Sequence, residues 1–171
     1  AISMFATNKD YADSLNGADL VHADGQFIVW MSKLKPNLQV PERSATTDLI
    51  FSASKAAEEN GIKFYLLGGS EAINKQCADV LQQKYPKLQI VGRRAGDFTE
   101  SQEQDVIDDI NASGAEVVWV GLGKPKEQIF CTRVKDRLNC AWLITCGGCF
   151  HFVVGDYKRA PAWMQKYGLE W

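Results

Sequence analysis

The residues best suited to bind a ligand lie in Gly121-Leu-Gly-Lys-Pro-Lys126, directly after the apolar run Val117–Val120. An apolar run, a glycine turn and a proline ahead of a polar segment predict a buried strand, a tight turn and the first turn of a helix. Glycines let backbone amides approach a ligand, and a helix N-terminus favours negative charge. Because two lysines add positive charge, the sequence predicts a site for an anion, most simply a phosphate.

The same pattern has a plainer interpretation. Short strand, glycine and helix junctions occur in many α/β proteins without a ligand, and Gly121-Leu-Gly123 lacks the third glycine of the dinucleotide fingerprint. Three further turns follow apolar runs, namely Asp24-Gly25, Gly68-Gly69-Ser70 and Gly147-Gly148. The carboxyl ends of parallel strands meet at one edge of a sheet, where ligands bind. The convergence of these turns on one edge favours a nucleotide or phosphate role.

The elements that must position these turns alternate regularly along the chain. Short apolar runs predict strands at 19–24, 63–67, 88–91, 116–120 and 141–145. Helical spacing of apolar residues predicts helices at 4–16, 26–34, 46–60, 71–84, 100–112 and 125–138. This alternation is typical of an α/β, Rossmann-like parallel sheet with helices on both faces. No linker or shift in composition divides the chain, so we expect residues 1–171 to form a single domain.

Composition excludes several classes of protein. The 19 Lys and Arg residues are balanced by 21 Asp and Glu residues, which argues against a nucleic-acid partner. No apolar run reaches the length of a membrane-spanning helix, and the N-terminus lacks the layout of a signal peptide, so a cytoplasmic location is expected. Five cysteines without an export signal are expected to be reduced thiols. Cys146 and Cys149 have the spacing of a redox pair or half a zinc site, but no second half accompanies them, and small buried residues are the favoured alternative.

Five blocks of the sequence carry a resemblance to a known family. They are Ala18–Gly25, Pro41–Asp48, Leu66–Gly69, Val120–Lys126 and Lys158–Gln165, the last followed by Gly168–Trp171. In this order they resemble the WecG/TagA/CpsF family of glycosyltransferases. The resemblance implies an inverting, metal-independent enzyme without a cofactor. Such an enzyme moves an N-acetylmannosamine-type sugar from a UDP-sugar donor to a polyprenyl-diphosphate-linked GlcNAc acceptor, in the synthesis of bacterial surface polymers such as teichoic acid or capsule.

The resemblance also implies roles for individual residues. Asp24 matches the position of the family's catalytic aspartate, although an aspartate before a glycine often only caps its own turn. No two aspartates lie two residues apart, so no Asp-x-Asp metal motif is present and protein groups are expected to meet the charge of the diphosphate. The expected substrate-binding residues are Arg43, Gly68, Gly69, Gly121, Gly123, Pro125, Lys126, Glu127, Gln128 and Gly147.

Three departures from the family pattern accompany this assignment. Relative to the family, the chain is expected to lack a first strand and a C-terminal tail, and it has Glu127-Gln128 where Gln-Glu is common. A carboxylate at 127 accepts hydrogen bonds but cannot donate one as an amide can. A non-catalytic domain that binds a nucleotide or sugar phosphate is the alternative, and a dinucleotide-dependent oxidoreductase is disfavoured. The aromatic and basic residues of 150–171 leave contact with a membrane surface, a homo-oligomer interface and core packing open.

Overall fold

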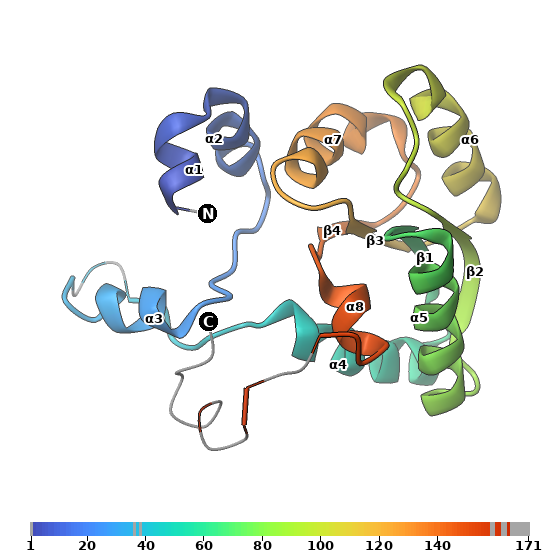
Figure 1. Cartoon of the computed structure of the whole chain (residues 1–171), viewed down its shortest axis with the longest axis horizontal. Coiled ribbons are helices and arrows are strands. Elements are labelled where there is room, and N and C mark those ends of the chain that lie inside the picture. The colour runs from blue at the N-terminus through green and yellow to red at the C-terminus, as the bar shows by residue number, and fades with distance from the viewer. Residues whose placement is uncertain (1, 36, 38, 158–159, 162–163, 165–171) are drawn as a thin grey trace.

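In the computed structural model, the residues described are 2–35, 37, 39–157, 160, 161 and 164. The described residues form one four-stranded sheet in the order β2-β1-β3-β4, and all of its pairs are parallel (Figure 1). The strands are β1 (Lys63–Gly68), β2 (Gln89–Arg94), β3 (Val117–Gly121) and β4 (Trp142–Thr145). The predicted α/β, Rossmann-like sheet is therefore confirmed.

Helices cover both faces of this sheet because alternate strand residues point to opposite sides. Phe64 and Leu66 of β1 pack against α4 (Thr46–Asn60), α5 (Glu71–Lys84) and α8 (Cys149–Val153). Tyr65 and Leu67 pack on the other face, against α6 (Glu103–Ser113) and α7 (Lys126–Val134). Figure 1 shows the first group below the sheet and the second above it. A strand buried on both faces reads as a continuous apolar run, which is why the sequence identified β1 and β3 readily.

Local rules set most helix ends in this part of the chain. Gly61 and Gly114 adopt φ values of 71° and 67° and end α4 and α6, and the Ser70 side chain accepts a hydrogen bond from the Ile73 amide at the start of α5. The predicted ranges 46–60 and 71–84 are confirmed. Short 3-10 turns lie before α6 (η2, Glu100–Gln102) and after α7 (η3, Lys135–Arg137), so both α-helices are shorter than predicted.

Strand β2 differs from its prediction. It continues through Gly92 to Arg94, three residues beyond the predicted end at Val91. Gly92 pairs with Tyr65 of β1, and a Cβ at Gly92 would lie 2.5 Å from the Tyr65 ring. This glycine therefore makes room for an aromatic ring inside the sheet.

The N-terminal region lies to one side of the sheet (Figure 1). The helix predicted at 4–16 is divided into α1 (Ile2–Thr7) and α2 (Lys9–Asn16), because the Asn8 side chain accepts a hydrogen bond from the Tyr11 amide and starts a new helix. The helix α3 (Gln26–Ser32) ends two residues before its predicted end.

The prediction of a strand at 19–24 is wrong. These residues are irregular, and Leu20 and Val21 are 74% and 61% exposed. The segment pairs with no strand in the described part of the chain and instead contacts the loop before α4: Ala23 accepts a hydrogen bond from the Ser44 amide at 2.8 Å. An apolar run predicts a strand only if a partner strand is available to it, and the sequence does not provide that information.

No helix among the described residues is long and apolar enough to cross a membrane. Most of the family-like block Lys158–Gln165, and all of Gly168–Trp171, lie outside the described residues.

Candidate functional site

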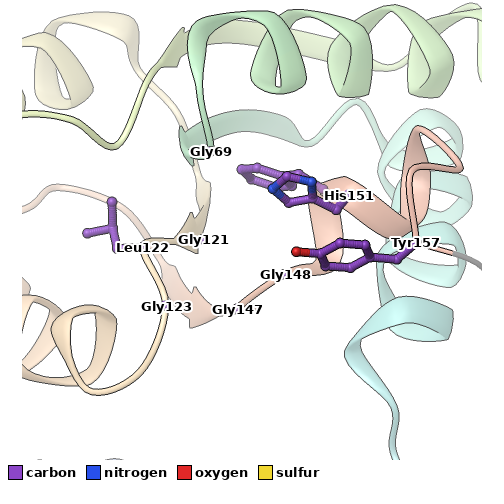
Figure 2. A pocket seen from close by; sticks show the side chains of 9 residues that line it. Gly69, Gly121, Leu122, Gly123, Gly147, Gly148, His151 and Tyr157 are labelled. Atoms are coloured by element: carbon purple, nitrogen blue, oxygen red, sulfur yellow. The ribbon is translucent and has the colours of Figure 1, made fainter.

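The order of the strands reverses between β1 and β3, because the chain moves outward from β1 to β2 on one side and to β4 on the other. Sheets of this kind bind ligands in the crevice at such a switch point. A pocket of about 240 Å³ opens there (Figure 2). It is smaller than the roughly 300–1,000 Å³ that encloses a drug-sized ligand, so it suits part of a larger molecule. Its lining consists of Gly69, Gly121, Leu122, Gly123, Gly147, Gly148, Phe150, His151 and Tyr157.

The glycines at this edge bring the strand ends close together. A Cβ at Gly68 would lie 2.2 Å from the Gly121 carbonyl oxygen, and a Cβ at Gly121 would lie 3.0 Å from that of Gly147. Gly69 has a φ of 64° and its amide donates a hydrogen bond to the Gly121 oxygen at 3.1 Å. The structure thus brings the sequence-predicted glycines 68, 69, 121, 123 and 147 to one edge. Gly68 and Gly121 also serve the backbone packing there.

Glu127 fastens the two loops that form the floor of the pocket. Its side chain is 1% exposed, and one carboxylate oxygen accepts hydrogen bonds from the amides of Gly123 (3.1 Å) and Gly147 (2.9 Å). The other oxygen accepts a hydrogen bond from the Gln128 side-chain amide at 2.9 Å. Burial raises the pKa of Glu127, and these three hydrogen bonds together with Lys124 act in the opposite direction.

This arrangement changes the interpretation of the glycine turn. The amides of Gly123 and Gly147 donate to Glu127, so they are not free to hold an anion as a helix N-terminus would. Both carboxylate oxygens of Glu127 are engaged, and a contact between this side chain and a donor stays a prediction. Gln128 is also buried, and its side-chain oxygen has no hydrogen-bond partner within the described chain.

Lys126, at the start of α7, contacts a loop outside the pocket lining. Pro125 is the N-cap residue of α7, after a cis peptide bond, and the helix begins at Lys126. The Lys126 ammonium donates to the Gly96 carbonyl oxygen at 3.0 Å and lies 4.8 Å from the centre of the Phe98 ring. Lys126 therefore contacts the loop after β2, and its predicted contact with a substrate is not part of this pocket.

Asp24 and Arg43 lie in segments that are brought together near the start of α8. Asp24 is exposed, and its charge acts on the buried thiol of Cys149. Burial raises the pKa of Cys149 to about 12, and Asp24 and Asp48 add to the shift. The Arg43 side chain is 15% exposed, and its guanidinium lies 3.6 Å from the Asp48 carboxylate. Asp24 thus acts on the first residue of α8, and Arg43 contacts Asp48, which acts on the same residue, although neither predicted residue lines the pocket.

Sequence reasoning missed several residues at this edge. Asn74 is fully buried, and its side-chain amide lies within hydrogen-bond distance of the carbonyl oxygens of Leu66, Gly68 and Arg94 (3.1, 2.8 and 3.1 Å), so it fixes the ends of β1 and β2. His151 and Tyr157 supply the polar side chains of the lining. An asparagine at the fourth position of a helix that follows Gly-Gly-Ser was the available signal for the first.

The described residues contain no group of three or more His, Cys, Asp or Glu side chains that could hold a metal ion. A doubly wound parallel sheet with a glycine-lined pocket at its switch point defines the α/β class of the fold and locates the crevice where such sheets bind ligands. The family model described as glycosyl transferase WecG/TagA/CpsF family matches residues 1–171, which is the whole chain. The chain therefore belongs to this family of glycosyltransferases of cell-surface polymer synthesis, and its substrates are a sugar donor and an acceptor.

Proposed function

We propose that the chain is an inverting glycosyltransferase that moves an N-acetylmannosamine-type sugar from a UDP-sugar to a polyprenyl-diphosphate-linked GlcNAc. The observation that carries this proposal is the pocket at the switch point, together with the charge of Asp24 that acts on Cys149 at the start of α8. The family membership supports a sugar transfer, and the position of the pocket supports a nucleotide donor across the ends of β1 and β3. We further propose that the reaction takes place at the inner face of the cell membrane, where a lipid-linked acceptor resides.

In the proposed reaction the acceptor hydroxyl oxygen attacks the anomeric carbon from the face opposite the diphosphate. The bond from that carbon to the β-phosphate oxygen breaks, and its electron pair leaves with UDP. The Asp24 carboxylate accepts the proton of the acceptor hydroxyl, which an exposed carboxylate is able to do. Arg43 is a candidate for an electrostatic contact with the departing diphosphate.

The experiment that tests this proposal is a donor screen with UDP-sugars, scored by UDP release in the presence of a polyprenyl-diphosphate GlcNAc acceptor. Asp24→Asn keeps the size of the side chain and removes the base, so turnover should fall about 10²–10⁴-fold. Because Asp24 is exposed, the melting temperature of the Asp24→Asn variant should equal that of the wild type. Asp19→Asn, at an exposed position of the same segment, is the matched control and should keep full turnover.

If the chain binds UDP but releases no UDP from any UDP-sugar in any acceptor mixture, the result would instead support a non-catalytic nucleotide-binding domain.

Metal independence is part of the proposal and has its own measurement. We expect the affinity for UDP to be the same in EDTA as in magnesium, because no Asp-x-Asp motif is present to hold a bridging ion. A loss of affinity in EDTA that magnesium or manganese restores would contradict it.

A further inference from the structure

A histidine, an aspartate and a tyrosine form a cluster on the wall of the pocket. The His151 Nδ1 atom lies 2.8 Å from a carboxylate oxygen of Asp156. The His151 ring stacks on the Tyr157 ring with centroids 4.7 Å apart and an angle of 14° between the planes. Phe152 supports the tyrosine from the side, with an edge-on contact at 5.5 Å. Figure 2 shows the Tyr157 hydroxyl directed towards the glycine turns, with the His151 ring beside it.

The cluster is built by a short stretch of chain. The amides of Asp156 and Tyr157 both donate to the His151 carbonyl oxygen, at 3.0 and 3.3 Å, and the turn passes through Gly155 with a φ of 81°. The Tyr157 ring then lies over Gly148, where a Cβ would be 3.4 Å from it. The positions of the two rings are therefore fixed by the turn that follows α8 and by the glycine loop that precedes it.

The hydrogen bonding of His151 leaves one ring nitrogen for a ligand. Asp156 engages Nδ1, and Nε2 has no hydrogen-bond partner within the described part of the chain. The side chain is 29% exposed and lines the pocket, so a ligand can reach it. With a carboxylate holding the Nδ1 proton, Nε2 accepts a hydrogen bond in the neutral ring and donates one in the imidazolium.

The chemistry of the pocket wall favours an anionic ligand at this nitrogen. Among the residues of the lining, His151 is the one whose side chain can carry a positive charge. The amides of Gly123 and Gly147, which could otherwise bind a phosphate, are taken by Glu127, and the carboxylate of Glu127 lies just beneath them. An anion in the pocket thus needs a compensating cation from the wall, and the imidazolium supplies one.

We infer that His151 and Tyr157 bind the diphosphate of the nucleotide donor, through Nε2–H and the phenol hydroxyl, and that Asp156 is a positioning residue for the imidazole. The inference rests on the proposed function, because the donor is what brings a diphosphate into the pocket. As the sugar leaves, the electron pair of the broken bond stays on the diphosphate oxygen. His151 keeps its proton and stabilises that charge by a hydrogen bond.

The test compares UDP with uridine, which lacks the diphosphate, by calorimetry. His151→Gln should lower the affinity for UDP about 10- to 100-fold and leave the affinity for uridine unchanged, because a charge-assisted hydrogen bond to phosphate is lost. Tyr157→Phe keeps the stacked ring and removes the hydroxyl, so UDP should weaken by about 2- to 10-fold. Melting temperatures of both variants should match the wild type, since both side chains are at the surface of the pocket.

Nitrogen NMR of the imidazole rings provides an independent measurement, because the chain has two histidines. UDP should shift the Nε2 resonance of His151, and the ring of His22, whose Nδ1 lies 2.7 Å from the Ser44 carbonyl oxygen, serves as the internal reference. Asp156→Asn should change the His151 resonances before any ligand is added. It should also lower the affinity for UDP without lowering the affinity for uridine. A merely structural role of Asp156 would weaken both ligands.

The outcomes separate the two proposals. If the wild type binds neither UDP nor a UDP-sugar, the proposed function fails and this assignment fails with it. If the wild type binds UDP and His151→Gln binds it equally well, the proposed function stands and the role of His151 is overturned. An equal loss of UDP and uridine in His151→Gln would also overturn it, because the diphosphate would then not be the group that His151 contacts.

Discussion

Two regions of this chain use their apolar side chains in opposite ways. From residue 46 to residue 153, most large apolar residues are enclosed between sheet and helices, and Trp119 is fully buried in the core cluster on the α4, α5 and α8 face of the sheet. In residues 2–35 the large apolar residues are mostly outside: Leu20 and Leu34 are each 74% exposed and Phe27 is 63% exposed. The first region therefore has the core of a stable domain, and the second is attached to it by few buried residues.

The comparison has a consequence for the candidate site. The pocket lining comes from the enclosed region and from Tyr157, which follows it. Asp24 and Arg43, the predicted base and a predicted phosphate contact, come from the second region and the loop after it. Tyr11 and Val29, each 2% exposed, anchor this second region, together with the hydrogen bond from the Lys135 ammonium to the Gly17 carbonyl oxygen at 3.2 Å. Substitutions in the two regions should therefore affect stability and activity separately.

The largest expected effect on stability is that of Trp119→Ala. The side chain lies 5.9 Å from Phe64 and 6.3 Å from Trp142, between ring centroids, and no hydrogen bond of its indole nitrogen is lost on truncation. The cost is thus the apolar contact and the cavity, about 3–5 kcal/mol of unfolding free energy. Urea denaturation measures it. A cost below about 1.5 kcal/mol would mean that the enclosed region is not the stable core.

Glu127→Ala should have the next largest effect, on both stability and the shape of the pocket floor. It leaves the amides of Gly123 and Gly147 without their shared acceptor, and unsatisfied buried donors cost about 1–3 kcal/mol each. Water in the pocket offsets part of this, so we expect a loss of about 2–4 kcal/mol in urea denaturation. Glu59→Ala, at an exposed position of α4, is the control and should change stability by less than about 0.5 kcal/mol.

Glu127→Gln separates the hydrogen bonds of this residue from its charge. The amide oxygen of the new glutamine can accept hydrogen bonds from both glycine amides. Its amide nitrogen can donate to the unpartnered side-chain oxygen of Gln128 once the Gln128 side-chain amide flips by about 180°. The net change near pH 5 should be within about 1 kcal/mol. An effect as large as that of Glu127→Ala would show that the charge, and not the hydrogen bonds, holds the two loops.

The pH dependence of Glu127→Gln has a definite sign. Because the pKa of Glu127 is raised in the folded protein above its ordinary 4.5, the stability that this group contributes is present below 4.5 and falls as pH rises through its folded value. Glutamine does not titrate. The variant should therefore gain stability relative to the wild type as pH rises from about 4 to 7, measured as the difference between urea midpoints. A difference that shrinks over this range would contradict the assigned direction.

How much the sequence predicted depends on whether local rules decided the structure. The ends of α4 and α5 were predicted correctly because Gly61 and Ser70 act through their own neighbours in the chain. The strand predicted at 19–24 was wrong because a strand depends on a partner. The continuation of β2 through Gly92 was not predicted, because the Tyr65 ring that fills the space of the missing Cβ comes from 27 positions earlier in the chain (92 minus 65).

The candidate site shows the same limit. The sequence predicted that the glycine turns meet at one edge of the sheet, because the carboxyl ends of parallel strands lie at the same edge. It did not predict that Glu127 would occupy the amides of Gly123 and Gly147, which are 4 and 20 positions away. Nor did it predict that His151 and Tyr157 would line the pocket, because their pairing depends on the turn at Gly155. The type and spacing of residues located the edge, and three-dimensional contacts decided which atoms remain available there.

The smallest expected effect is that of Trp30→Ala, and it tests the comparison from the other side. Trp30 lies on α3 and is 43% exposed, next to Met31, which is 48% exposed. Truncation removes little buried area, and alanine favours a helix, so the unfolding free energy should change by about 0.5 kcal/mol or less. The same residue type would then cost several-fold less here than at position 119, with UDP affinity unchanged. A loss above about 2 kcal/mol would mean that this face is covered in solution. Two causes are then possible, a second copy of the chain or packing within one molecule. Sedimentation of the wild type at several concentrations would show a dimer in the first case only, and the loss of unfolding free energy would then disappear on dilution.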